Sequence, residues 1–154
     1  VAIVGTEGEG PVLVDFSSSY DFEHIDALGF GLTTAGFRIV LDPSIPDVIG
    51  ANIHATVQTL LDQNNIDRSQ VSTWCFHPGG SRILDAAQTM LGLTDLQMRA
   101  SRRVLANYGN MSSPTVLFVL AEALRSHPPP PDSYGVLAAF GPGLGIEAAL
   151  MRFE

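Results

Sequence analysis

The chain has 154 residues, of which 45% are hydrophobic and 16% charged, and its formal net charge is -8 at pH 7. This length fits one domain, and the plentiful, dispersed apolar residues exclude intrinsic disorder. All eight basic residues are arginine, and so acidic a chain is a poor partner for nucleic acid, whose phosphates bind clustered basic side chains. No apolar run reaches the roughly 18–20 residues that a membrane span needs.

The single cysteine, the first residue and the low charge bear on the cellular compartment and on assembly with a partner. One cysteine excludes a disulfide framework within the chain and a thiolate metal cluster, and it fits a reducing cytosol. The chain begins at Val1 rather than Met and has no signal-peptide pattern, so we expect it to be processed or to be part of a longer polypeptide. The low charge and high apolar content indicate an apolar surface that a partner covers.

The first third of the chain predicts short strands and glycine-rich turns. Residues 1–4 and 12–16 read as two strands of a hairpin, joined by a turn over 6–11. Residues 17–27 are rich in Ser and Asp without a clear period, and we expect a loop there. The stretch 29–36 is rich in Gly and Thr, and 37–41 reads as a strand that Asp42 and Pro43 stop.

From Pro46 onward apolar residues recur at steps of three and four, which predicts helices alternating with strands. Gly92 is expected to end one helix, and Ser112 or Ser113 to cap another that opens at Pro114. The expected elements are a helix over 46–64, a strand over 71–76, helices over 83–91, about 95–106 and 114–125, a stiff proline loop over 127–131, and strands over 134–140 and 146–153. This order, ββ(β)αβααα-ββ, predicts a mixed α/β layer fold without an internal domain boundary.

Two junctions carry side chains suited to catalysis. His77 stands where a strand stops and a Pro-Gly-Gly turn begins, and glycines there allow a ligand to approach the backbone closely. Asn110 stands in a turn just before a helix start. A His and an Asn that both donate hydrogen bonds can hold a developing oxyanion. On the residues alone, a satisfied strand-end histidine and an ordinary turn asparagine are the favoured interpretations of the two positions.

Several segments together resemble the C-terminal domain of chalcone and stilbene synthases, the type III polyketide synthases. The resemblance is carried, in order, by His77-Pro78-Gly79-Gly80, Ile83-Leu84-Asp85, Met98-Arg99-Ala100-Ser101, Tyr108-Gly109-Asn110-Met111-Ser112-Ser113 and Phe140-Gly141-Pro142-Gly143-Leu144. It is strong from about residue 71 to 153 and continues weakly back through Phe37 and Pro46. The chain would then be one C-terminal domain over residues 1–154, less than half of such an enzyme.

The resemblance implies a thiolase-type layered α/β fold, with a mixed sheet and packed helices, and a Cys-His-Asn site. It implies an acyltransferase that condenses malonyl-CoA onto an acyl-CoA starter by decarboxylative Claisen condensation. His77 and Asn110 match the His and the Asn, whereas the nucleophilic cysteine belongs to an N-terminal half that this chain does not contain. Cys75 lies two residues before His77 on the same strand face, so we interpret it as a small buried hydrophobe.

Five other residues match the family's substrate-binding positions. Phe37 aligns with an aromatic residue near the active-site entrance, Ser112 is expected to line the cavity, and Pro142 to shape it. Gly80 belongs to the glycine turn after His77, and Arg82, near a helix start, is expected to contact a CoA phosphate. Core packing, helix capping and a solvated surface arginine are the plain alternatives for Phe37, Ser112 and Arg82.

The resemblance further implies a cytoplasmic homodimer with acyl-CoA and malonyl-CoA as substrates, the N-terminal half as partner, and neither a metal nor a further cofactor. Two rival functions stay open. One is an initiating 3-ketoacyl-carrier-protein synthase, which shares the fold and the His and Asn pair. The other is a non-catalytic thiolase-fold subunit that serves only in assembly. On the main interpretation the intact protein is an acyltransferase, and we expect the isolated chain to be inactive because the nucleophilic cysteine is missing.

Overall fold

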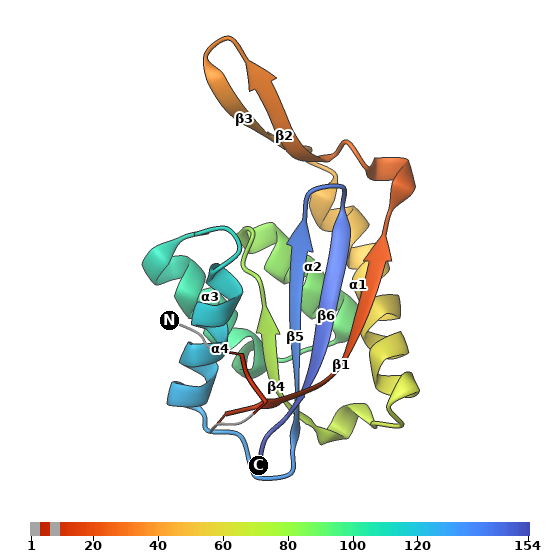
Figure 1. Ribbon diagram of the computed structural model, residues 1–154, viewed down its shortest axis with the longest axis vertical. Helices are drawn as coiled ribbons and strands as arrows, with labels where there is room; N and C mark the ends of the chain where they lie inside the picture. The colour runs from red at the N-terminus through yellow and green to blue at the C-terminus, as the bar shows by residue number, and fades with distance from the viewer. Residues whose placement is uncertain (1–3, 7–9) are drawn as a thin grey trace.

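Four strands form one mixed sheet at the centre of the computed structural model, which describes residues 4–6 and 10–154 (Figure 1). Its strand order is β1-β6-β5-β4, with bounds Val12–Tyr20, Gly145–Arg152, Tyr134–Gly141 and Val71–Phe76. β6 runs antiparallel to both neighbours, and β4 runs parallel to β5. The ends of β4 and β5 therefore meet at one edge of the sheet, together with the β5–β6 turn.

Helices cover the two faces of this sheet (Figure 1). α1 (Ile45–Gln63) and α2 (Ser81–Leu91) pack on one face, and α3 (Asp95–Tyr108) and α4 (Thr115–Ser126) pack beside β4 and β5 on the other. The alternation of β4 divides its side chains between the two cores. Trp74 and Phe76 join the core of α1 and α2, whereas Cys75 joins that of α3 and α4.

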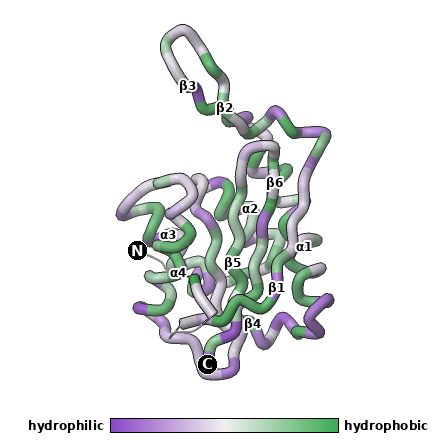
Figure 2. Tube along the Cα trace, in the orientation of Figure 1, coloured by the Kyte–Doolittle hydropathy of each residue, from purple (hydrophilic) through white to green (hydrophobic). Residues whose placement is uncertain are grey.

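A second, two-stranded sheet stands apart from the body. β2 (Leu28–Thr33) and β3 (Gly36–Leu41) form a hairpin that projects beyond one end of the main sheet (Figure 1). Separate hydrophobic segments interrupt the paler trace of this hairpin (Figure 2). Short 3-10 turns, Phe22–His24 and Arg68–Gln70, precede the hairpin and β4.

Most of the elements expected from the sequence are confirmed, and so is the mixed α/β layer fold. The helix expected over 46–64 is α1, and Gly92 ends α2 with a left-handed φ of 56°. The expectation of a loop over 17–27 is wrong for 17–20, because β1 continues to Tyr20, whereas 21–27 form turns. The hydroxyl-bearing residues of this stretch are accommodated in the strand because they find partners, as Ser19 does with Thr56 Oγ1 at 2.6 Å.

The hairpin expected between 1–4 and 12–16 is not supported by the described residues. Positions 1–3 lie outside them, Val4 is not in a strand, and β1 pairs with β6. The Gly/Thr-rich stretch 29–36 instead contributes most of β2, and the strand expected over 37–41 is its partner β3.

Candidate active site

His77 lies immediately after β4, where the sheet edge meets α2. Its backbone N–H donates to the Ala138 carbonyl at 2.8 Å, which ties the residue to β5. The residue is only 7% exposed, and burial lowers the pKa of its imidazole below the ordinary 6.5. The ring is therefore neutral at neutral pH, with one nitrogen that donates and one that accepts.

The turn after His77 is closely packed at Gly79. A Cβ built on Gly79 would lie 2.9 Å from Cδ1 of Ile83, and 3.8 Å from Cδ2 of the His77 ring. Gly80 follows as the N-cap of α2 without a side-chain cap hydrogen bond. The backbone thus approaches His77 closely and leaves the first turn of α2 free of a capping side chain.

Asn110 lies in the exposed loop between α3 and α4. Gly109 ends α3 with a positive φ of 70°, and the Asn110 Oδ1 accepts a hydrogen bond from the Ser112 N–H at 2.8 Å. Thr115 fastens the rest of the loop, because its Oγ1 accepts from the Met111 N–H at 2.8 Å and donates to the Ser112 carbonyl at 2.7 Å. These contacts fix the asparagine amide in one orientation.

The two junctions meet through one hydrogen bond. Nδ2 of Asn110 donates to the Gly79 carbonyl at 3.4 Å, although 31 residues separate the two along the chain. An amide nitrogen has two N–H groups, so the second remains for another acceptor. The structure thus brings Asn110 beside the turn that follows His77.

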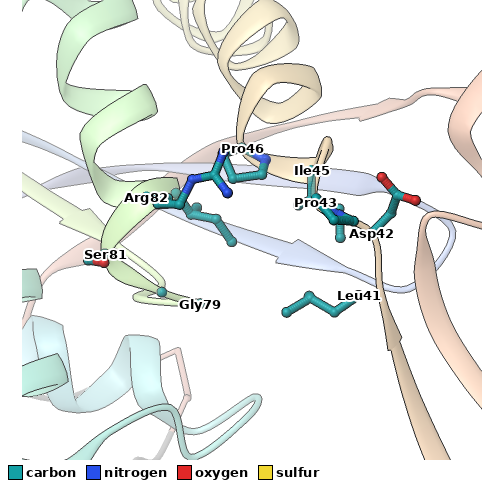
Figure 3. Close-up of a pocket in the computed structure, with 10 residues that line it drawn as sticks. Leu41, Asp42, Pro43, Ile45, Pro46, Gly79, Ser81 and Arg82 are labelled. Carbon is teal, nitrogen blue, oxygen red and sulfur yellow. The ribbon is translucent and has the colours of Figure 1, made fainter.

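A cavity of about 240 Å³ opens beside this turn, between α2 and the start of α1 (Figure 3). Arg82 faces Pro46 across it, and Asp42 lies on the far side (Figure 3). The cavity includes Gly80 and Arg82 among the expected substrate-binding residues. Its lining residues are Leu41, Asp42, Pro43, Ile45, Pro46, Gly79, Gly80, Ser81, Arg82 and Ile83.

The other three expected substrate-binding residues lie apart from this cavity. Phe37 is 86% exposed on the hairpin, and Pro142 is exposed in the β5–β6 turn. Ser112 is exposed with a positive φ of 65°. The alternative in which Ser112 or Ser113 caps α4 is wrong, because Pro114 is the N-cap without a side-chain hydrogen bond and α4 starts one residue later than expected.

Cys75 is fully buried in the core of α3 and α4, where burial raises the pKa of its thiol to about 12. A thiol with that pKa holds almost no thiolate at neutral pH, and the thiolate is the nucleophilic form. The interpretation of Cys75 as a packing residue is consistent with this environment.

The apolar face of the hairpin is a feature that the sequence analysis missed. The register pairs Leu28 with Leu41, Phe30 with Ile39 and Leu32 with Phe37. All six therefore share one face, while three glycines, Thr33, Arg38 and Val40 occupy the other. The signal was the apolar residue at every second position of 28–32 and of 37–41, which the glycines of the first run and Val40 in the second obscured.

Comparisons with known proteins give the family. Residues 23–153 match chalcone and stilbene synthases, C-terminal domain. The chain is 37% identical over 147 residues to a 3,5-dihydroxyphenylacetyl-CoA synthase of Streptomyces toyocaensis, covering 94% of this chain and 38% of that protein. Among solved structures it resembles PKS-I of the brown alga Ectocarpus siliculosus, with a TM-score of 0.87 and 31% identity, covering 99% of this chain and 42% of that one. It also resembles the 1,3,6,8-tetrahydroxynaphthalene synthase of Streptomyces coelicolor A3(2), a bacterial type III polyketide synthase. The TM-score is 0.90 at 28% identity, and the match covers 99% of this chain and 43% of that one.

The layered fold is thus of the thiolase type found in condensing enzymes. The chain belongs to the chalcone and stilbene synthase family, as a C-terminal domain of the type III polyketide synthases. It spans only about two fifths of the relatives it matches, 38% and 42% in two of them. Within the part of the chain that the structure describes, no helix has the length and apolarity to cross a membrane.

Proposed function

We propose that this chain supplies the His and the Asn of a Cys-His-Asn site in an acyltransferase that condenses malonyl-CoA onto an acyl-CoA starter. The observation that carries the proposal is the hydrogen bond from Asn110 to the Gly79 carbonyl, which joins the two junctions. The nucleophilic cysteine comes from an N-terminal half, and we call the polypeptide that holds both halves the intact enzyme. It works in the cytoplasm as a homodimer, and the reaction needs neither a metal nor a further cofactor.

The reaction begins when the cysteine thiolate attacks the starter thioester and releases CoA. His77 and Asn110 then donate hydrogen bonds to the thioester oxygen of malonyl-CoA. The bond between the malonyl methylene and its carboxylate breaks, CO2 leaves, and the electron pair moves into an enolate whose charge rests on that oxygen. The enolate carbon attacks the acyl carbonyl on the cysteine, a C–C bond forms, and the C–S bond breaks to return the thiolate.

The neutral state of His77 suits this role. Because burial lowers the pKa of the imidazole, the ring donates an N–H without carrying a charge, and it accepts at its other nitrogen. Donors fixed in advance need no reorganisation when charge develops on the oxygen. His77 also helps to ionise the cysteine of the other half, because its accepting nitrogen takes the thiol proton and the imidazolium that forms then stabilises the thiolate.

The cavity beside Gly79 suits the CoA portion of the substrates. Arg82 supplies a cation for a phosphate, and Gly80, at the start of α2, presents backbone without a side chain. Phe37, Ser112 and Pro142 then face the growing acyl chain from the hairpin, the α3–α4 loop and the β5–β6 turn. None of these three residues lines the cavity of about 240 Å³, so we expect the other half to complete the acyl pocket.

The test is to incubate the intact enzyme with an acyl-CoA starter and malonyl-CoA and to measure CO2, free CoA and polyketide. We expect all three, and none of the polyketide from the 154-residue chain alone, because it lacks the nucleophile. Product from the isolated chain would overturn the proposal. The sequence upstream of Val1 separates the rivals: a missing cysteine favours an assembly subunit, and a strong preference for malonyl on a carrier protein favours a ketoacyl synthase.

A further inference from the structure

Three polar side chains join the end of β1 to the start of β6. Tyr20 Oη donates to Glu147 Oε1 at 2.9 Å, and Ser18 Oγ donates to Glu147 Oε2. The ring of Tyr20 lies against Gly145, where an added Cβ would come within 2.9 Å of Cε1. We call Ser18, Tyr20 and Glu147 the carboxylate clamp. The hydrogen bond to Glu147 raises the pKa of Tyr20, so the phenol keeps the proton that it donates.

The clamp stands directly after a strained turn. Gly143 and Leu144 both have positive φ, 78° and 51°, and Leu144 is only 3% exposed. A leucine rarely adopts this conformation, and it persists only where the surroundings fix it. One such contact is the Asp21 N–H, which donates to the Leu144 carbonyl at 3.4 Å. The clamp joins β1 to β6 just after this turn, through the hydrogen bonds from Ser18 and Tyr20 to Glu147.

The same turn is bonded to the base of the hairpin. The Gly143 N–H donates to the carbonyl of Leu28, the first residue of β2, at 2.9 Å. The Asp42 N–H donates to the Ala27 carbonyl, also at 2.9 Å, and closes the base from the other side. The position of the turn that carries Pro142 and the direction of the hairpin therefore depend on each other (Figure 1).

We propose that the carboxylate clamp is a positioning device that fixes the Pro142 turn and, through the Gly143–Leu28 hydrogen bond, the hairpin, whose Leu41 lines the cavity beside Gly79, and so determines how far the acyl chain grows before release. The inference rests on the proposed function for its consequence in catalysis. The clamp residues act through the turn and hairpin and touch no reacting atom.

The experiment compares Tyr20→Phe, Glu147→Ala and Glu147→Gln in the intact enzyme, with Tyr134→Phe, at the opposite end of β5, as the matched control. Two quantities are measured: the ratio of full-length to prematurely released products, and the exchange rate of the Gly143 amide. Tyr20→Phe and Glu147→Ala should change each by about two- to tenfold, the range for one lost hydrogen bond. Starter loading should stay the same, because the nucleophile lies elsewhere.

Glu147→Gln should retain both wild-type values, because its amide oxygen still accepts from Tyr20. Unchanged product ratios in Tyr20→Phe and Glu147→Ala, or an equal loss of every step, would overturn the inference. If Glu147→Ala does not fold, Tyr20→Phe decides alone, since it keeps the ring over Gly145. If the wild-type enzyme makes no polyketide, the proposed function fails, and unchanged Gly143 exchange in Tyr20→Phe would separately refute the clamp.

Discussion

The body and the β2–β3 hairpin use similar apolar residues in opposite ways. In the body, Ile49 and Ile53 of α1 are fully buried against the sheet and α2. In the hairpin, Phe37 and Ile39 are 86% and 66% exposed although they share a face with four other apolar side chains. A two-stranded hairpin is marginally stable by itself. The body therefore buries its apolar residues around the segments that carry the proposed catalytic pair, whereas the hairpin leaves its apolar face exposed in this chain.

The largest expected difference comes from the same substitution made in both regions. Ile49→Ala should lower the free energy of unfolding by about 2–5 kcal/mol, because it leaves a cavity in a closed core. Ile39→Ala should change it by less than about 0.5 kcal/mol, because the side chain is mostly solvated in this chain. Urea denaturation of both variants gives the values. Equal losses would mean that the hairpin packs on the body after all.

Alanine substitutions at one glycine of the body, Gly135, and one of the hairpin, Gly29, should give a smaller difference in stability. A Cβ on Gly135 would lie 2.9 Å from two ring carbons of Phe153, whereas one on Gly29 of the hairpin meets nothing within 4 Å. Gly135→Ala should therefore destabilise the chain by about 1–3 kcal/mol through overpacking. Gly29→Ala should change the stability by less than about 0.5 kcal/mol. Thermal unfolding measures both, and a larger loss at Gly29 would contradict this account of the two regions.

Cys75→Ala is the mildest change to the body. It replaces a small buried side chain by a smaller one, and we expect a loss of about 1 kcal/mol with little effect on the activity of the intact enzyme. Because burial raises the pKa of the thiol to about 12, the wild-type residue should resist alkylation at pH 8 unless the chain is unfolded. Normal folding of the variant combined with failure to accept a starter acyl group would identify Cys75 as the nucleophile instead.

The sequence predicts the body better than the hairpin for physical reasons. The three- and four-residue period of α1 and the glycine that ends α2 are local signals, and both helices appear within two residues of the expected bounds. The strand character of Ser17–Tyr20 depends on pairing with β6 and on partners for its hydroxyl groups, which no local pattern reveals. Ser112 resembles a cap in sequence, but its positive φ places it outside the capping geometry.

Some parts of the candidate site are also recognisable from the sequence, whereas others depend on the fold. His77 and Asn110 are recognisable because each stands in a distinctive turn, and the fold brings them to one edge. The cavity contains Leu41 and Pro43, which follow from how the hairpin base meets α1 and not from a motif. The carboxylate clamp joins residues 127 apart, Tyr20 and Glu147, through strand register alone.

The oxyanion role of Asn110 is tested most directly in the intact enzyme that carries Asn110→Ala. Malonyl-CoA decarboxylation is measured as CO2 release, and starter loading is measured in parallel. The account predicts that decarboxylation falls by about 10²–10³-fold, the usual effect of removing one oxyanion donor, while loading of the cysteine stays near the wild-type rate. His77→Ala should impair decarboxylation and also slow alkylation of the cysteine near neutral pH. Near wild-type decarboxylation in Asn110→Ala would contradict the account and return Asn110 to the role of an ordinary turn residue.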